Sequence, residues 1–223
     1  MSSDAGRIAG RLDDVRRRIE TAARRSGRRP EDVSLVAVSK GHGAAAVRAV
    51  LEAGQRRLGE NYAQELLAKQ QELVDARADW HFIGRLQRNK VRHVVGRVAL
   101  VHGIDDMVLV GEIDHRASAR QDVLLQVSLA GEAQKGGASP GALDALVTAC
   151  AHSKHVRCVG LMTMPPRGDD PEKSRPHYRE LRALAERLGL GELSMGMSAD
   201  FEVAVEEGAT LVRVGTAIFG PRG

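Results

Sequence analysis

Apolar residues recur along the chain with two spacings, and each spacing predicts a different kind of element. Near the N-terminus they return every three or four residues, which places them on one face of a helix: Ile8, Leu12, Val15, Ile19 and Ala22. Arginines occupy the other faces, and Ser26-Gly27 provides a stop. The pattern predicts an amphipathic helix within residues 1–28, packed outside the rest of the fold.

After this helix, short apolar runs rich in β-branched residues alternate with helical patterns. Eight runs predict buried strands: residues 32–40, 56–60, 79–84, 97–104, 121–129, 155–164, 191–196 and 210–215. Each run is followed by a helical pattern. One example is residues 61–76, a predicted helix with these side chains inward: Ala63, Leu66, Leu67, Leu73 and Val74.

Eight strands that are each followed by a helix predict a closed (β/α)₈ barrel, a TIM barrel, with the leading helix as an addition. An open doubly wound sheet is the alternative. That fold usually carries a glycine-rich phosphate fingerprint after its first strand, whereas this chain has "SKGHGAA" there and no GxxxxGK[ST] loop. No domain boundary is visible, so residues 1–223 are expected to form a single barrel domain.

Composition and charge restrict the cellular location and the binding partners expected for this protein. The chain has 223 residues, and its two cysteines make no metal-binding or disulfide pattern. No signal peptide or bilayer-spanning run is present, which predicts a soluble cytoplasmic protein that binds no membrane. The net charge of +4 comes largely from residues 7–29, but six aromatic residues of the Phe, Trp and Tyr type offer little for base stacking. We therefore favour a solvated helix face over a nucleic-acid site.

In such a barrel the active face collects the carboxyl ends of the strands, and phosphate often lies at the loops after strands seven and eight. Here these loops read "SMGMSAD" and "VGTAIFG". Both offer small residues, backbone N–H groups, hydroxyls and a helix start, which suit a phosphate dianion. Each also has a structural interpretation, since Ser198 suits a helix N-cap and Gly215 a tight turn.

Lys40 ends the first strand and would face the same cavity. Partial burial and a nearby cation such as Arg213 would lower the pKa of its amine, and a neutral amine attacks an aldehyde to form a Schiff base. A lysine together with a phosphate cradle is what pyridoxal phosphate requires. Spacing alone leaves a surface lysine at a strand end as the alternative.

At this point the sequence resembles the pyridoxal phosphate homeostasis proteins, a family similar to the N-terminal domain of alanine racemase. The matching stretches run in order from about residue 33 to the C-terminus: "LVAVSK", "EAGQRRLGENYAQE", "WHFIGRLQRNK", "LLQVSLAGEAQKGG", "VGLMTMPP" and "LSMGMSADFEVAVEEGATLVRVGTAIFGPR". The resemblance implies a (β/α)₈ barrel that carries pyridoxal 5′-phosphate (PLP) as a lysine aldimine.

The resemblance also implies roles for individual residues of the cofactor site. Lys40 matches the Schiff-base lysine, and Arg213 matches the residue near the pyridine nitrogen. Positions that hold the phosphate match Ser198, Gly215 and Thr216, and a polar position lining the pocket matches Asn61. The chain departs from the family at "KGHGAAA", where two glycines are expected to loosen the loop. His42 in this loop is interpreted as exposed, with a proton carrier as the alternative.

These assignments favour a cofactor-binding protein without efficient catalysis over a small PLP-dependent racemase or lyase. Arginine is always charged and only donates, so it would leave the pyridine nitrogen unprotonated and the ring a weaker electron sink. The resembled racemases supply a catalytic tyrosine from a second domain, for which this chain leaves no room. Of its two tyrosines, Tyr62 is predicted to open a helix and Tyr178 to lie in the core.

The family implies a role in PLP homeostasis, with PLP-dependent apo-enzymes as possible partners, and we expect a monomer. The third alternative is an RNA or DNA binder that uses residues 7–29. His81 and His102 are interpreted as core or supporting histidines, and no cluster has metal-ligand spacing, so no metal is predicted. The "EAQKGG" loop, residues 132–137, is either a cover for the pocket or a surface loop.

Overall fold

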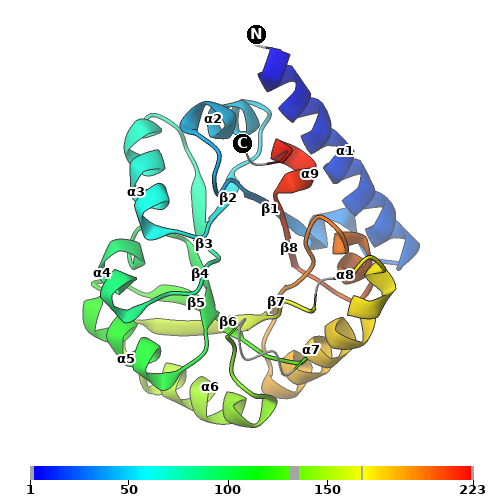
Figure 1. Ribbon diagram of the computed structural model, residues 1–223. Coiled ribbons are helices and arrows are strands. Elements are labelled where there is room, and N and C mark those ends of the chain that lie inside the picture. The colour runs from blue at the N-terminus through cyan, green and yellow to red at the C-terminus, as the bar shows by residue number, and fades with distance from the viewer. Residues whose placement is uncertain (1–2, 131–135, 167, 222–223) are drawn as a thin grey trace.

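The computed structural model describes residues 3–130, 136–166 and 168–221. Eight parallel strands close into a barrel in the order of the sequence, as predicted (Figure 1). The strands are β1 (Ser34–Val38), β2 (Arg57–Glu60), β3 (Asp79–Phe82), β4 (Leu100–Ile104), β5 (Gln121–Gln126), β6 (Val156–Met162), β7 (Glu192–Ser194) and β8 (Leu211–Val214). The barrel closes through β1 and β8, where Ser34 to Ala37 pair with Leu211 to Val214.

Helices form a ring around this barrel. They are α1 (Ser3–Arg25), α2 (Ala44–Glu52), α3 (Ala63–Glu72), α4 (Val91–Val94), α5 (Met107–Arg116), α6 (Leu143–His152), α7 (Arg175–Leu188), α8 (Phe201–Glu206) and α9 (Thr216–Phe219). Among the described residues, no helix combines the length and apolar character needed to cross a lipid bilayer.

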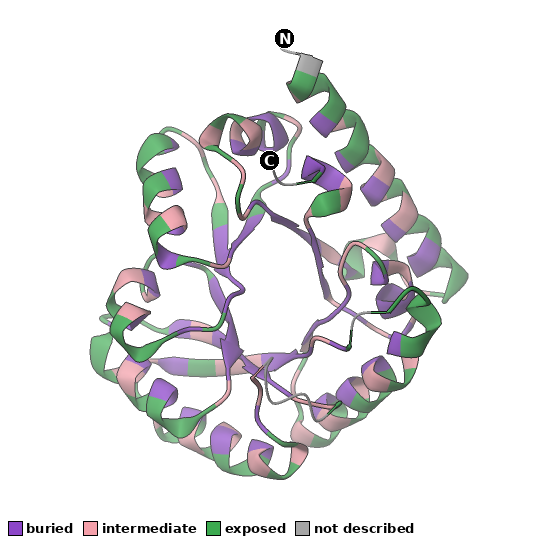
Figure 2. Cartoon of the chain, in the orientation of Figure 1, coloured by how far each residue is buried: buried purple, intermediate pink, exposed green. Residues whose placement is uncertain are grey.

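The alternation of side chains along each strand produces two apolar layers. The larger layer fills the space between strands and helices, and Leu58, Val101 and Val212 in it are fully buried. Figure 2 shows buried residues along the strands and on the surrounding helices. A smaller cluster comes from five strands and fills the barrel interior: Val36, Leu100, Leu124, Met162 and Leu211. Strands buried on both faces explain the continuous apolar runs of the sequence.

Helix α1 lies outside the barrel, as the sequence predicted, against α2, α8 and α9 (Figure 1). Its arginines bind carboxylates of the same chain: Arg18 contacts Glu202 at 2.9 Å and lies 4.6 Å from the centre of the Phe201 ring. Arg25 pairs with Glu206 in the same way. These intramolecular ion pairs, on side chains that stay 35% and 62% exposed, agree with a solvated helix face.

Two predictions about helix boundaries were wrong. Helix α3 ends at Glu72 rather than near residue 76, so Val74 is not inward but 86% exposed. Ser198 does not begin a helix, because α8 begins at Phe201 with Asp200 in the N-cap position. Ser198 instead lies in the preceding turn, at the mouth of the barrel, and is therefore available to a ligand.

Candidate functional site

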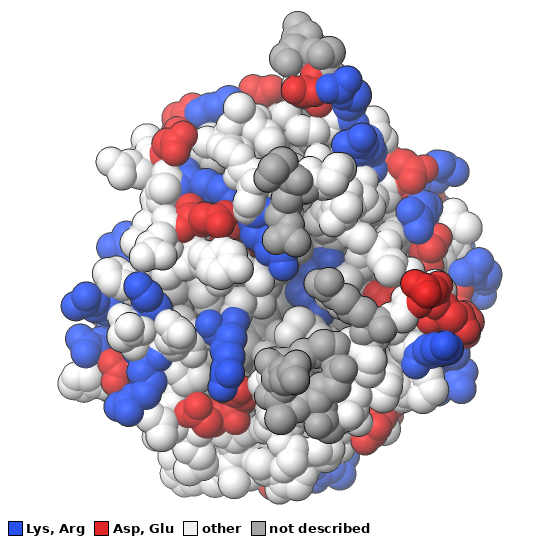
Figure 3. Space-filling model, in the orientation of Figure 1, with Lys and Arg blue, Asp and Glu red and all other residues white. Residues whose placement is uncertain are grey.

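A cavity of about 390 Å³ opens at the carboxyl ends of the strands. Its lining includes every residue that the sequence proposed for the cofactor: Lys40, Asn61, Ser198, Arg213, Gly215 and Thr216. Figure 3 views this face and shows basic side chains around the hollow near its centre. The volume is within the range of small-molecule sites, about 300–1,000 Å³.

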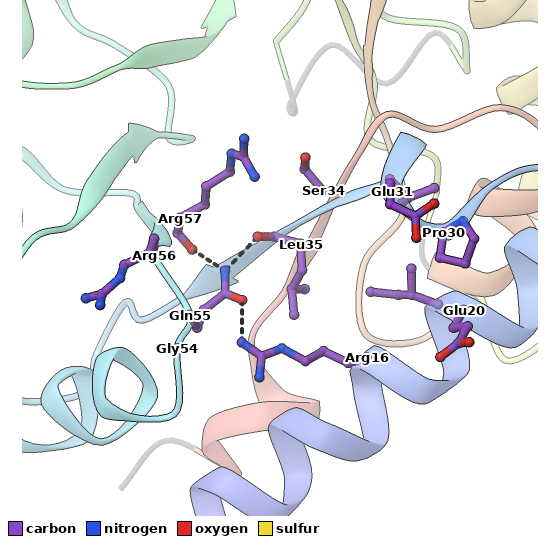
Figure 4. A pocket seen from close by; sticks show the side chains of 12 residues that line it. Arg16, Glu20, Pro30, Glu31, Ser34, Leu35, Gly54, Gln55, Arg56 and Arg57 are labelled. Carbon is purple, nitrogen blue, oxygen red and sulfur yellow. Dashed lines mark hydrogen bonds between the residues drawn. The ribbon is translucent and has the colours of Figure 1, made fainter.

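A second cavity, of about 420 Å³, lies at the opposite end of the barrel (Figure 4). Its polar groups are used to pack α1 onto the barrel. Arg16 donates a 2.9 Å hydrogen bond to the carbonyl oxygen of Ala53 and lies 3.5 Å from the side-chain oxygen of Gln55. Gln55 in turn donates to the carbonyl oxygens of Leu35 and Arg57. None of the six proposed residues lines this cavity.

Lys40 follows β1 in a turn that is held from below by buried polar groups. Ser39 is fully buried, and its hydroxyl donates a 2.5 Å hydrogen bond to Glu60 Oε1. The ammonium of Lys69 donates to the Ser39 carbonyl oxygen at 2.7 Å and to Glu60 Oε1 at 2.5 Å. Lys40 itself is half-buried and lines the cavity.

The residue after Lys40 is held from the other side. The Gly41 amide donates to Glu65 Oε2 at 2.9 Å, and Lys69 lies 3.2 Å from that same oxygen. One buried ammonium therefore joins the contacts on both neighbours of Lys40. Burial raises the pKa of Glu60, although its hydrogen bonds from Lys69 and Ser39 oppose this shift. We call Ser39, Glu60, Glu65 and Lys69 the lysine clamp.

The loop that carries Lys40 is thus anchored despite its glycines. Gly41 has φ +74°, a conformation that favours glycine, so one of the two glycines shapes the turn. The sequence suggested that His42 is exposed, and this was wrong. His42 is half-buried and lines the cavity. Its ring stacks on Phe219 with centroids 5.0 Å apart, which joins this loop to α9.

Opposite the lysine, the turns after β7 and β8 meet at Ser198. The backbone amides of Gly215 and Ala217 point at the Ser198 hydroxyl oxygen, at 3.3 and 3.4 Å. A Cβ atom on Gly215 would lie 3.1 Å from the carbonyl oxygen of Val38, so a side chain there would press on the end of β1. Thr216 begins α9 beside them. Hydroxyls and amide donors of this kind suit a phosphate group.

Asp200 organises this turn, and sequence reasoning missed it. Its Oδ1 accepts a 2.8 Å hydrogen bond from the Met197 amide, and its Oδ2 accepts from Ser174 at 2.8 Å and from Tyr178 at 2.7 Å. Tyr178 is fully buried, as predicted, and burial raises its pKa. Its hydroxyl is thereby used to support the Ser198 turn. The signal available in the sequence was an aspartate just before a helix start.

Arg213 lies on β8 beneath the cavity and is 4% exposed. Its guanidinium donates to Ser194 Oγ at 2.6 Å and to the Thr163 carbonyl oxygen at 3.0 Å. Burial lowers its pKa to about 10, with the neighbouring Tyr178 and Asp200 acting in the opposite direction. Arg213 therefore remains a cation at neutral pH.

Asn61 follows β2 and presents an unused acceptor. Its Oδ1 is buried and has no hydrogen-bond partner among the described residues. The backbone here is tightly placed, because a Cβ atom on Gly84 would lie 2.2 Å from the Asn61 carbonyl oxygen. A buried acceptor without a partner is costly, so an occupant or a water that donates to Asn61 would stabilise the site.

Other predicted features lie around this cavity or outside the described residues. No tyrosine is among the described residues that line it, and Tyr62 is 57% exposed at the start of α3. His81 and His102 are buried inside the barrel, as predicted. Of the "EAQKGG" loop, residues 132–135 are outside the described part, and the Gly137 amide donates to Asp105 at 3.0 Å.

Comparison with known proteins defines first the class of this barrel. The family model for the alanine racemase N-terminal domain matches residues 11–223. Alanine racemase from Corynebacterium glutamicum shares the fold, with a TM-score of 0.71 and 16% identity over 93% of this chain and 60% of that one.

More similar relatives then define the family. A pyridoxal phosphate homeostasis protein of Aquifex aeolicus is 44% identical, covering 95% of this chain and 97% of its own. That of Escherichia coli K12 is 38% identical, covering 96% and 97%. The structure of PipY from Synechococcus elongatus with PLP bound has a TM-score of 0.85 and 38% identity, covering 96% of this chain and all of that one. The chain belongs to the pyridoxal phosphate homeostasis protein family.

Proposed function

We propose that this protein binds PLP reversibly through Lys40 and maintains the intracellular supply of the cofactor, without an efficient reaction of its own. The observation that carries the proposal is that one cavity is lined by an amine, a cluster of phosphate-type donors and a buried cation. When bound, PLP supplies an aldehyde that joins reversibly to a primary amine with loss of water.

The residues present fit each part of the cofactor. Ser198, Gly215 and Thr216 offer hydroxyl and amide groups to the phosphate, and Gly215 leaves room that a Cβ would take. Arg213 offers a donor that stays charged to the pyridine nitrogen and so keeps that nitrogen unprotonated. Asn61 offers an acceptor that has no partner among the described residues.

The same residues account for weak catalysis. Racemisation needs an acid and a base on opposite faces of the substrate carbon, and Lys40 supplies one group only. No described tyrosine lines the cavity, and the Tyr178 hydroxyl is bound to Asp200. A cation at the pyridine nitrogen also makes the ring a weaker electron sink. Binding and release are therefore the function, and turnover is not.

Four finer statements complete the proposal. Residues 1–223 form one domain, with α1 as an outer support, because α1 contacts three helices of the ring. The protein acts in the cytoplasm as a monomer. It passes PLP to apo-enzymes that depend on this cofactor. Size-exclusion chromatography with light scattering, and transfer assays with purified apo-enzymes, test the last two statements.

The direct test of binding is an absorbance titration of the purified protein with PLP. The wild-type chain is expected to develop the band of lysine-bound cofactor, and Lys40→Ala is expected to lack it while remaining folded. Lys154→Ala is the matched control, because Lys154 is exposed and lies at the opposite end of the barrel. An unchanged band in Lys40→Ala would contradict the assignment.

A further inference from the structure

We propose that Ser194, His102 and His81 form a buried hydrogen-bond chain that positions Arg213 toward the cofactor cavity. The proposal rests on the proposed function, since Arg213 matters there as the partner of the pyridine nitrogen. It assigns a purpose to two histidines that the binding of PLP does not itself use.

The chain crosses the interior of the barrel. Arg213 on β8 donates to Ser194 Oγ on β7 at 2.6 Å, and Ser194 Oγ lies 2.8 Å from His102 Nδ1 on β4. His102 Nε2 lies 2.9 Å from His81 Nδ1 on β3. Strands β4 and β7 are not neighbours in the sheet (Figure 1). The contact between their side chains therefore spans the inside of the barrel.

The donors and acceptors along the chain have one consistent direction. Arginine only donates, so the Ser194 oxygen accepts from Arg213 and its own proton is free for His102 Nδ1. In the proposed direction Ser194 donates to His102 Nδ1, so His102 carries its proton on Nε2 and donates it to His81 Nδ1. His81 in turn carries its proton on Nε2. This direction gives both neutral rings the same tautomer.

Both rings remain neutral because of their surroundings. Burial lowers the pKa of His81 to about 4, with the charge of Arg57 adding to this effect. Burial also lowers the pKa of His102, and the neighbouring His81 and Arg213 add to this effect. A protonated His102 could not accept from Ser194 and would instead donate to the Ser194 oxygen, in competition with Arg213.

Arg213 needs these hydrogen bonds to fix its position because it forms no salt bridge with a carboxylate in the described part of the chain. The carboxylate that acts on Arg213 electrostatically is that of Asp200. The oxygens of Asp200 accept from Ser174, Tyr178 and the Met197 amide. Ser194 and the Thr163 carbonyl oxygen therefore decide where the guanidinium points.

The first measurement uses the protein without PLP. Nitrogen-15 NMR of histidine-labelled protein at pH 7 is expected to show both rings neutral with the proton on Nε2. The two rings are assigned by the signals that His81→Asn and His102→Asn remove. A ring protonated at pH 7, or a proton on Nδ1 of His102, would overturn the proposal. Since no cofactor is present, this result is independent of the proposed function.

The second measurement uses the PLP-loaded protein and separates positioning from general loosening. His102→Leu and Ser194→Ala remove the link to Arg213, whereas His102→Asn keeps an acceptor where Nδ1 was. Loss of a hydrogen bond to a charged group predicts PLP release about tenfold faster in the first two variants, and His102→Asn within about threefold of wild type. Leu124→Ala, a cavity in the same interior, is the control for stability alone.

The ¹⁵N chemical shift of the pyridine nitrogen reports on the position of Arg213. It would not change if the histidines only stabilised the fold. With ¹⁵N-labelled PLP, the ring-nitrogen shift is expected to match wild type in His102→Asn and Leu124→Ala. In His102→Leu and Ser194→Ala it is expected to move toward the value of PLP in water. Equal shifts and equal release rates in all four variants would overturn the proposal. Failure of wild type to bind PLP would instead refute the proposed function.

Discussion

The two ends of the cavity hold their cations by opposite means. At the lysine end, the ammonium of Lys69 is buried against Glu60 and Glu65, so the clamp under Lys40 is built around ion pairs. At the arginine end, Arg213 is held by a hydroxyl and a carbonyl oxygen backed by neutral histidines. The first arrangement fixes a backbone turn, and the second leaves the charge of Arg213 available to a ligand.

The largest effect is expected from breaking the ion pair between Lys69 and Glu60 in the clamp. Lys69→Met leaves Glu60, which is fully buried, without its cation. Loss of one partner of a buried pair typically costs about 3–5 kcal/mol in the free energy of unfolding. Urea denaturation measures it, with the exposed Lys154→Met as the control. The double variant Lys69→Met with Glu60→Gln is expected to recover part of the loss, and no loss in Lys69→Met would contradict the clamp.

A smaller effect on stability is expected from protonating His81, a neutral ring at the arginine end. The folded-state pKa of His81 is about 4, below its usual value of 6.5. The unfolded chain therefore binds more protons between these values, and stability falls as pH decreases through that window. For His81 alone the loss between pH 7 and pH 5 is about 2 kcal/mol.

His81→Asn tests this sign, because asparagine does not titrate and keeps an acceptor near the position of Nδ1. Urea denaturation of wild type and variant at pH 7 and pH 5 is expected to show a shallower pH dependence in the variant. The clamp variant Lys69→Met retains His81. The decrease of its stability between pH 7 and pH 5 is therefore expected to keep the contribution of His81. Identical slopes in wild type and His81→Asn would contradict the neutral buried ring.

The smallest effect is expected from two glycine substitutions, one at each end. Gly43 has φ −73° and a Cβ there would meet nothing within 4 Å, so Gly43→Ala should be nearly neutral. Gly215→Ala would bring a Cβ to 3.1 Å from the Val38 carbonyl oxygen. It is expected to weaken PLP binding about tenfold, or about 1.4 kcal/mol. Isothermal titration with PLP measures both, and equal affinities would count against the phosphate assignment.

The alternation of apolar runs was sufficient to predict the barrel, because parallel strands buried on both faces leave a clear pattern. The same rule brought Lys40, Asn61 and Arg213 to one mouth, since strand ends converge there. The clamp was not predictable in this way. Lys69 has the spacing of an ordinary helix lysine, and only the packing of α3 on β2 brings it to Glu60.

The hydrogen bonds that position Arg213 could not be predicted from the sequence for a similar reason. Ser194 and His102 are separated by 92 positions in the sequence, and no local pattern links them. Tyr178 lay correctly on an apolar stripe, but its hydroxyl partner, Asp200, belongs to a later turn. Element boundaries also failed where no cap marks them, as at Val74 beyond the end of α3.

The central claim is that the amine of Lys40 holds the cofactor, and borohydride reduction tests it most directly. The protein is incubated with PLP, reduced, digested and mapped by mass spectrometry. A single labelled peptide that contains Lys40, absent from Lys40→Ala and present in Lys154→Ala, is the predicted result. A label that stays on another lysine, Lys69 included, or no label in the wild-type chain, would contradict the account.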